Sequence, residues 1–200
     1  MNPQSTVDLH LHSTASDGML EPAALVAHVA GCGVELMALT DHDTVAGIEA
    51  AAAAARVHGI DFVAGVELSV TWRGRELHVL GLAIDPQAPV LAHGLGTQQT
   101  LREARAERIA ARLEAAGAPG NAAMTSIRAA GSLPTRTHFA RALVAAGAAA
   151  DVQAAFDRWL AKRGETRRPW REMVGYIHCC SYKAAPGIAL GNLEVILHQA

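Results

Sequence analysis

The chain has 200 residues and a mass of 20.9 kDa; 50% of its residues are hydrophobic and 18% are charged. This composition excludes a disordered chain, and three cysteines are too few for a disulfide-stapled scaffold. The sequence contains no run of about 18 strongly apolar residues, and its first residues are polar, which argues against a secretory signal. We therefore expect a cytoplasmic protein of one domain, with or without an insertion, that does not span a membrane.

The net charge of −2 hides an uneven distribution. Residues 1–90 contain 11 Asp and Glu against 3 Lys and Arg, whereas residues 91–200 contain 8 against 14. An acidic first part suits metal cations and a basic second part suits an anionic substrate, although ordinary variation of surface charge would give the same imbalance.

The first part of the chain predicts alternating strands and helices. Pro22 suits the first position of a helix because its missing N–H has no intrahelical partner there, and Gly31 and Gly59 are typical of helix ends. Strands are expected over 6–11, 34–39, 60–64, 67–72 and 76–84, with helices over 22–31 and from a Thr44 cap to 58. This order is typical of a parallel sheet or barrel, followed by a hairpin at Arg73-Gly74-Arg75.

The pattern changes near Pro86, where alternation of strands and helices gives way to Ala-rich helical segments. Helices are expected over 97–116, 121–130, 137–146 and 151–162, separated by Gly or Pro. The sequence therefore predicts an α/β domain with a small helical unit inserted into it or appended to it.

The first candidate metal ligands lie at the end of the first strand. His10 and His12 are two residues apart, so their side chains project from the same face of a strand. Asp17 lies in the following loop and can fold back onto the pair. Imidazole and carboxylate together suit Zn²⁺, Mn²⁺ or Fe²⁺, although an isolated His-x-His is more often two unrelated histidines.

Further ligand-type residues follow the next strands. His42 lies directly after the second strand, Glu67 after the third, and His78 on the fourth. Because the ends of parallel strands share one rim, we expect all of these side chains to converge. A hydrogen bond from Asp41 or Asp43 would orient the far ring nitrogen of His42, or Asp43 would cap the next helix.

Four ordered motifs, DLHLHSTASDG, ALTDHDTVAGI, AGVELSV and RGRELHVLGL, resemble the PHP (polymerase and histidinol phosphatase) superfamily. The likeness is to its stand-alone metal-dependent phosphoesterases, which include nucleoside 3′,5′-bisphosphate phosphatases and a 5′-to-3′ exoribonuclease. It implies an incomplete, distorted (β/α)7 barrel with a helical insertion. It also implies two or three divalent metal ions, most often Mn²⁺, with Zn²⁺, Fe²⁺ and Mg²⁺ as alternatives. The ligands that it implies are His10, His12, Asp17, His42, Glu67 and His78.

The resemblance also divides the chain and suggests substrate contacts. It implies a first part of the barrel over 1–87, a helical insertion over 88–165 and a divergent remainder over 166–200. Within the insertion, LPTRTHFAR resembles a family stretch whose Arg and His face the site. Arg136 and His138 are therefore expected to bind substrate, with Arg136 contacting its phosphate. Arg141 is expected at the surface.

The resemblance weakens after about residue 166. The family's A-H-P motif has Ala185 in place of the His, its D-x-H motif is not found, and the sequence resembles a truncated or frame-shifted end. His178, Cys179, Cys180 and His198 are interpreted as surface or core residues rather than replacement ligands. An incomplete barrel exposes a strand edge, which a homodimer could cover.

The leading hypothesis is a phosphoesterase that releases phosphate from a nucleotide-like substrate, such as a nucleoside 3′,5′-bisphosphate or a short RNA end. Duplex DNA is not an expected partner, because no basic tract with interleaved aromatic residues is visible. The alternative is a catalytically impaired fragment that binds metal at most. An accessory domain of a polymerase is a weaker alternative, since the chain carries no polymerase sequence.

Overall fold

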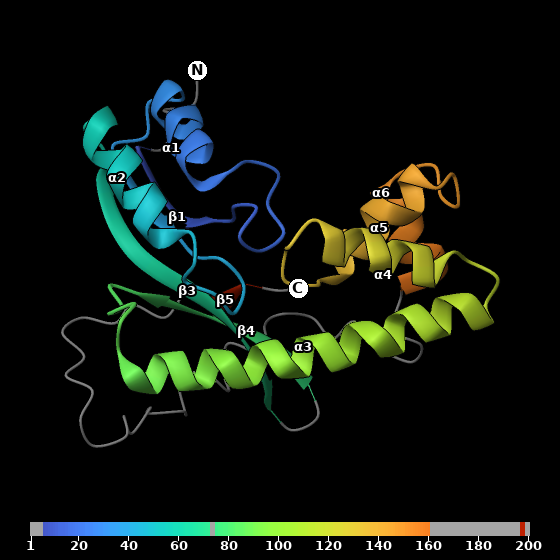
Figure 1. Cartoon of the computed structure of the whole chain (residues 1–200). Helices are drawn as coiled ribbons and strands as arrows, with labels where there is room; N and C mark the ends of the chain where they lie inside the picture. Colours follow the sequence, from blue (N-terminus) through green and yellow to red (C-terminus); the bar gives the residue numbers. More distant parts are fainter. Residues whose placement is uncertain (1–5, 73–74, 161–196, 199–200) are drawn as a thin grey trace.

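The computed structural model describes residues 6–72, 75–160 and 197–198 of the chain (Figure 1). The first part contains strands and two helices: β1 (Val7–Leu11), α1 (Pro22–Gly31), β2 (Leu36–Leu39), α2 (Ile48–His58), β3 (Asp61–Trp72) and β4 (Arg75–Leu82). The second part is helical: α3 (Pro89–Ala115), α4 (Gly120–Ala129), α5 (Arg136–Ala145), α6 (Val152–Ala155) and a π-helical turn at Phe156–Leu160. A short strand, β5 (Leu197–His198), pairs with β4.

The strands form one mixed sheet in the order β1-β2-β3-β4-β5. β1, β2 and the first half of β3 are parallel, whereas β3 and β4 form an antiparallel hairpin. The expected strands over 60–64 and 67–72 are one continuous strand, because Gly65 stays in the sheet rather than forming a turn. The α/β class and the incomplete barrel predicted from the sequence are confirmed.

Gly65 is required where β3 passes β2. A Cβ atom at this position would lie 2.7 Å from Thr40 Cγ2 and 3.0 Å from the Leu39 carbonyl oxygen. The close approach brings β3 against the end of β2, so Glu67 lies beyond the last residue of β2 at the same rim as the loop that carries His42.

Helices α1 and α2 pack together and against the parallel strands. Their shared core consists of apolar side chains from both helices, from β2 and from the link between α2 and β3, namely Leu25, Val26, Val29, Met37, Leu39, Ile48, Ala51, Ala55 and Ile60. α1 begins at Pro22 as expected, and Gly59 ends α2 in the left-handed conformation with φ 68°. The expected Thr44 cap is wrong: α2 begins at Ile48, and the Thr44 hydroxyl instead accepts a hydrogen bond from the Ala46 N–H.

The helical part has a hydrophobic core of its own. Side chains from α3, the α3–α4 link, α4, α5, α6 and the π-helical turn form it, namely Ala106, Ile109, Ala110, Leu113, Ala118, Ala123, Met124, Ile127, Phe139, Ala140, Leu143, Ala155 and Leu160. The 27-residue helix α3 begins eight residues earlier than the sequence predicted and runs from the sheet to this second core (Figure 1). The boundaries of the expected domains, at 87 and 165, remain predictions.

In the described ranges, no helix is both long and apolar enough to cross a membrane.

Candidate metal centre

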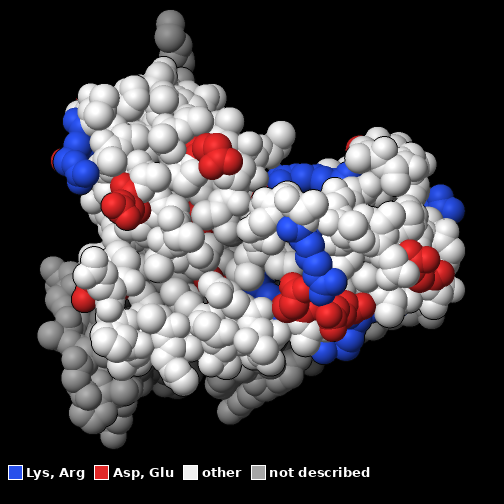
Figure 2. All heavy atoms as spheres, in the orientation of Figure 1, with Lys and Arg blue, Asp and Glu red and all other residues white. Residues whose placement is uncertain are grey.

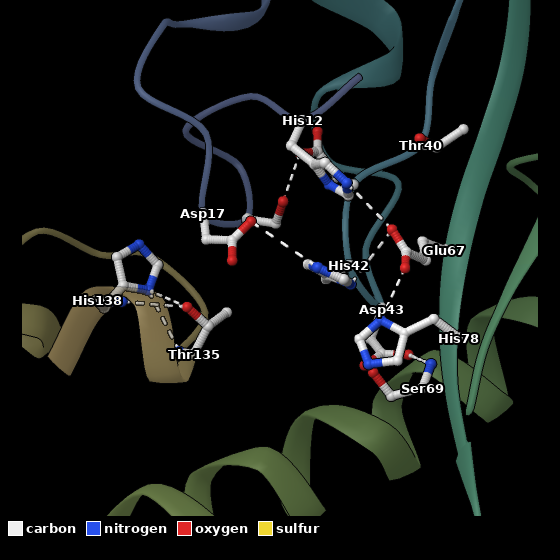
Figure 3. A network of polar contacts seen from close by, with 12 residues as sticks. His12, Asp17, Thr40, His42, Asp43, Glu67, Ser69, His78, Thr135 and His138 are labelled. Atoms are coloured by element: carbon white, nitrogen blue, oxygen red, sulfur yellow. Dashed lines mark hydrogen bonds and ion pairs between the residues drawn. The ribbon is translucent and has the colours of Figure 1, made fainter. Parts of the chain in front are cut away.

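Six ligand-type side chains from four segments converge at one rim of the sheet (Figure 3). They form three overlapping groups, in each of which the candidate ligand atoms lie within 4.8 Å of one another. The groups are His10, His12 and Glu67; His12, Asp17 and His42; and His42, Glu67 and His78. His12, His42 and Glu67 each belong to two groups, so the three groups are one continuous cluster.

β1 and its loop supply the first three side chains. His10 Nε2 lies 2.9 Å from Glu67 Oε2, and His12 Nε2 lies 3.1 Å from both His10 Nε2 and Glu67 Oε2. The following loop folds back over His12 because residue 18 is glycine: a Cβ atom there would lie 2.1 Å from the His12 carbonyl oxygen. This turn brings Asp17 within 3.9 Å of His42 Nε2.

Glu67 is the centre of the cluster. It is almost completely buried, at 2% exposure, and its two carboxylate oxygens face different histidines. Oε1 lies 2.7 Å from His78 Nδ1, whereas Oε2 faces His10 and His12 and lies 3.6 Å from His42 Nδ1. The sequence predicted Glu67 at a strand–loop junction; it lies within β3 and reaches the rim because β3 extends past β2.

The donor atoms fit a metal site better than a hydrogen-bonded network. Three buried ring nitrogens, His12 Nδ1, His42 Nδ1 and His78 Nε2, have no hydrogen-bond partner among the described residues. The rings of His12 and His42 stack with centroids 4.5 Å apart, and two ring nitrogens face each other between His10 and His12. Buried polar atoms without partners are costly, and a cation shared by neutral imidazoles and carboxylates removes that cost.

The electrostatics of the cluster keep its carboxylate charged. Burial alone raises the pKa of Glu67, but hydrogen bonds from His10, His12 and His78 outweigh it and hold the pKa far below its usual range. Burial lowers the pKa of His42 to about 4, so this ring stays neutral near neutral pH. Burial also opposes a charge on His12, but the hydrogen bond and charge of Glu67 outweigh it and raise the His12 pKa.

We expect the affinity for metal ions to fall as the pH is lowered, because protons compete with the metal ion for His12. A raised His12 pKa means that the ring holds its proton to a higher pH in the metal-free protein, and a metal ion must displace that proton. His42, with its pKa of about 4, adds no proton over the same range. The affinity for Mn²⁺, measured by titration calorimetry, should fall between about pH 8 and pH 6, because metal binding must release the proton that His12 holds. An affinity independent of pH over this range would contradict the arrangement.

Asp41 and Asp43 do not orient His42 as the sequence suggested. Among the described residues, neither carboxylate accepts a hydrogen bond from that ring. Asp41 accepts hydrogen bonds from the Ser13 N–H at 2.7 Å and from the Ser13 and Ser16 hydroxyls at 2.6 Å each, and its burial raises its pKa. It therefore holds the loop between His12 and Asp17 rather than a histidine ring.

Asp43 connects the His42 loop to β3 and α3. Its backbone has φ 50°, a left-handed conformation that Asp tolerates better than most residues. Its carboxylate accepts hydrogen bonds from the Ser69 N–H at 2.8 Å and from Arg102 Nε at 2.5 Å. Arg102, which is 9% exposed, also donates from Nη2 to the Ser69 hydroxyl at 2.7 Å. Sequence reasoning missed Arg102, because it lies 59 residues from Asp43 and no local motif marks the pair.

α5 holds the loop that carries Asp17. Arg141 Nη1 donates to the Asp17 carbonyl oxygen at 2.8 Å, so the expected surface position of Arg141 is wrong: the side chain is half-buried. Burial raises the pKa of Asp17, but the charges of His42 and His12 and a hydrogen bond from the Thr137 side chain lower it overall. The Ser132 hydroxyl also lies 3.4 Å from the Thr14 carbonyl oxygen of the same loop. The helical unit therefore shapes one ligand of the cluster.

Replacing Arg141 with Met should weaken metal binding about 10-fold to 100-fold, the usual effect of losing a residue that holds a ligand in place. The substitution keeps the length of the side chain but removes the donor to Asp17. Equilibrium titration with Mn²⁺ measures this effect, and Arg141→Lys, which keeps a donor, should lose less. Equal affinities for the wild-type protein and Arg141→Met would show that this contact does not position Asp17.

A cavity of about 260 Å³ adjoins the cluster. Asp17, His42 and His78 line it from the first part of the chain, and three arginines line it from the helical unit, namely Arg102, Arg105 and Arg136. Apolar side chains complete its wall, among them Ile109, Pro134, Phe139 and Phe156. The cavity thus combines candidate metal ligands with a concentration of positive charge.

The two residues expected to bind substrate have different surroundings in the structure. Arg136 lines the cavity. The His138 ring instead belongs to a capping box at the start of α5: its Nδ1 accepts a hydrogen bond from the Thr135 N–H at 3.3 Å, while the Thr135 hydroxyl accepts one from the His138 N–H at 3.3 Å (Figure 3). Burial lowers the pKa of His138 and keeps the ring neutral. Contact of either residue with substrate remains a prediction.

The expectations for His178, Cys179, Cys180 and the Ala184-Ala185-Pro186 segment lie outside the described residues. His198 is described only through its backbone, which pairs with His78 in the β4–β5 ladder.

The fold and the cluster together define an α/β protein whose strand ends carry a histidine- and carboxylate-rich site suited to divalent metal ions. The PHP domain family matches residues 8–184, and the chain belongs to this family. The match continues past residue 166, beyond the point where the motifs alone show a resemblance.

Curated relatives of this chain are named as an exoribonuclease and as a nucleoside bisphosphate phosphatase. The chain is 42% identical over 185 residues to a 5′-3′ exoribonuclease of Haemophilus influenzae, covering 92% of this chain and 66% of that protein. It is 39% identical over 201 aligned positions to a 3′,5′-nucleoside bisphosphate phosphatase of Chromobacterium violaceum, covering 97% of this chain and 67% of that protein. The chain thus spans about two thirds of the length of these relatives.

Solved structures show the same fold. An amidohydrolase from Chromobacterium violaceum with bound sulfate and no metal is 39% identical, with a TM-score of 0.74, over 87% of this chain and 63% of that one. A protein from Bifidobacterium adolescentis that is described as a metal-dependent phosphoesterase is 26% identical, with a TM-score of 0.72, over 82% of this chain and 58% of that one.

Proposed function

We propose that this protein is a metal-dependent phosphoesterase that releases phosphate from a nucleotide-like substrate. The observation that carries the proposal is the cavity in which Asp17, His42 and His78 face Arg102, Arg105 and Arg136. A phosphate group needs both a Lewis acid at its oxygens and cationic donors around it, and these two requirements meet here. The names of the relatives support a nucleoside 3′,5′-bisphosphate or the end of a short RNA as the substrate class.

The six clustered side chains, His10, His12, Asp17, His42, Glu67 and His78, are the proposed metal ligands. Their mixture of imidazole and carboxylate suits Mn²⁺ and also accommodates Zn²⁺ or Fe²⁺, whereas Mg²⁺ prefers oxygen ligands. Three overlapping groups would provide for two or three ions, and Glu67 belongs to two of these groups. When bound, such ions supply charge neutralisation at phosphate oxygens and lower the pKa of a coordinated water.

The remaining residues bind and orient the substrate. Arg136 presents a planar fork that matches two phosphate oxygens. The apolar wall at Ile109, Phe139 and Phe156 excludes water on one side of the cavity and strengthens these charge interactions. Arg102 is held by Asp43 and Ser69, so its guanidinium lies at a fixed place in the cavity wall, with its charge balanced by Asp43.

We infer a homodimer that covers the exposed sheet edge, a cytoplasmic location, and no binding of duplex DNA. Light scattering coupled to size-exclusion chromatography measures the association state, and we expect twice the mass of the single chain.

The test of the proposed activity is phosphate release by the full chain with Mn²⁺ and a nucleoside 3′,5′-bisphosphate, beside a 5′-phosphorylated oligoribonucleotide. We expect release with one or both substrates and none after chelation. Arg136→Ala should raise KM and leave metal content intact, whereas Arg136→Lys should recover part of the affinity. Metal binding without any turnover would instead support the alternative of a catalytically impaired protein.

A further inference from the structure

Three of the four arginines of α3 lie on a different flank of the helix from its glutamates. In the sequence the two charges alternate, as in REARAER, and no basic tract is visible. On a helix, however, Arg105, Arg108 and Arg112 are spaced by three and four residues and share one flank. Glu103 and Glu107 are four residues apart on the other flank, across the buried stripe that contains Ala106 and Leu113. Figure 2 shows an acidic patch over α3 with basic groups on either side of it.

Part of the negative charge on the acidic flank is balanced from within the protein, because one arginine of α4 contacts both glutamates. Arg128 of α4 donates from Nε to Glu103 at 2.7 Å and from Nη2 to Glu107 at 3.0 Å. The basic flank has no such compensation at its far end: the side chains of Arg108 and Arg112 are exposed and have no hydrogen bond or ion pair within the described part of the chain. The outer half of α3 therefore carries net positive charge along one flank.

The basic flank is continuous with the cavity of the candidate metal centre. Arg105 lines that cavity, and Arg108 and Arg112 follow it along the same helix. At a rise of 1.5 Å per residue, Arg112 lies about 10 Å along the helix axis from Arg105. An anion that reaches beyond the cavity in this direction meets one arginine at each successive turn.

We propose that Arg108 and Arg112, together with Arg105 at the cavity mouth, form a docking surface for the backbone phosphates of a single-stranded polynucleotide whose end lies in the cavity. The proposal rests on the proposed phosphoesterase function. A polynucleotide fits because it carries one phosphate at each regular step, and arginine forks match phosphate oxygens. An acidic peptide or an anionic lipid surface would meet the same charges but would not need to begin in a phosphate-binding cavity.

The length of the basic flank of α3 determines how many nucleotides can contact it. A stacked strand advances about 3.4 Å per nucleotide, so 10 Å of helix corresponds to roughly three nucleotides beyond the terminal one. Arg108 is not among the residues that line the cavity, so we do not expect a mononucleotide bisphosphate held there to depend on it. Affinity should therefore rise with length up to about four nucleotides and then level off.

The test compares Arg108→Gln/Arg112→Gln and each of its single variants with the wild-type chain and with Arg56→Gln, which removes one positive charge on the exposed part of α2. Arg56→Gln is the matched control for each single variant. Binding of 5′-phosphorylated oligoribonucleotides of one to eight nucleotides is measured by fluorescence anisotropy over a range of salt concentrations. Each lost contact to a single strand lowers the salt slope by about 0.7, so the double variant should lose about 1.4 in slope and roughly 25-fold in affinity at 0.1 M salt. Arg108→Lys/Arg112→Lys should restore most of the slope.

Turnover of a nucleoside 3′,5′-bisphosphate separates this proposal from the proposed function. We expect unchanged kcat and KM for that substrate in the double glutamine variant, with loss confined to the longer strands. An unchanged salt slope for oligonucleotides, or an equal loss in Arg56→Gln, would overturn the docking surface while leaving the phosphoesterase intact. Equal weakening for polyglutamate and for RNA would overturn it as well, because it would reveal general attraction of anions. If the wild-type chain has no phosphatase activity, the binding measurement still decides the matter.

Discussion

Replacing Glu67 with glutamine should abolish phosphate release, with a loss on the order of 10³-fold or more, which corresponds to roughly 4 kcal/mol. Glu67 belongs to two of the three groups of ligand-type side chains, and its two oxygens face different histidines. A neutral amide of the same shape presents only one acceptor atom, so it cannot serve both positions. Mn²⁺ content should fall together with activity, which metal analysis and a phosphate-release assay measure side by side.

The matched control is Glu35→Gln, which removes one negative charge at an exposed position between α1 and β2. It should leave both metal content and turnover unchanged. Because the metal-free Glu67→Gln variant retains a side chain of the same volume, its circular dichroism spectrum should remain that of a folded protein. Full activity in a folded Glu67→Gln protein would show that the cluster is not the catalytic centre.

Replacing Arg102 with methionine should destabilise the protein by about 3–5 kcal/mol, the usual effect of removing one partner of a buried ion pair. Asp43 is completely buried, and Arg102 Nε donates to its carboxylate at 2.5 Å. Without the guanidinium, a negative charge stays buried beside the His42 loop. Urea unfolding of the metal-free protein measures the loss.

A double variant distinguishes the buried charge from lost packing. Arg102→Met/Asp43→Asn removes both charges, and asparagine tolerates the left-handed φ of 50° at position 43. It should recover at least half of the stability lost in Arg102→Met. If the two substitutions instead add their separate losses, Arg102 contributes through packing alone and does not hold the His42 loop by its charge.

The sequence was sufficient to predict the parts of the site that depend on local pattern. His10 and His12 alternate on one strand, and parallel strands bring the loop of His42 to the same rim. These relations follow from the period of a strand and from β-α-β order, so they need no knowledge of distant contacts. The continuous strand β3 was missed because a glycine within a strand resembles a turn until its neighbours are known.

The supporting contacts could not be predicted, because they join segments that are far apart in the chain. Arg141 reaches the Asp17 carbonyl across 124 residues, and Arg102 reaches Asp43 across 59. Both arginines resemble ordinary surface residues of Ala-rich helices, and only the packing of the helical unit brings them to the sheet. The local sequence also suggested that Asp41 orients the adjacent His42, whereas its carboxylate binds Ser13 and Ser16 in another loop.

The most direct test of the central claim is a crystal structure of the full chain grown with Mn²⁺, with anomalous scattering recorded to locate the ions. We predict at least one anomalous peak within about 2.5 Å of Glu67 and of two histidines of the cluster. In that state the 3.1 Å contact between His10 Nε2 and His12 Nε2 should be replaced by bonds to the ion. A well-ordered cluster without an anomalous peak, at a Mn²⁺ concentration that supports phosphate release, would contradict the account.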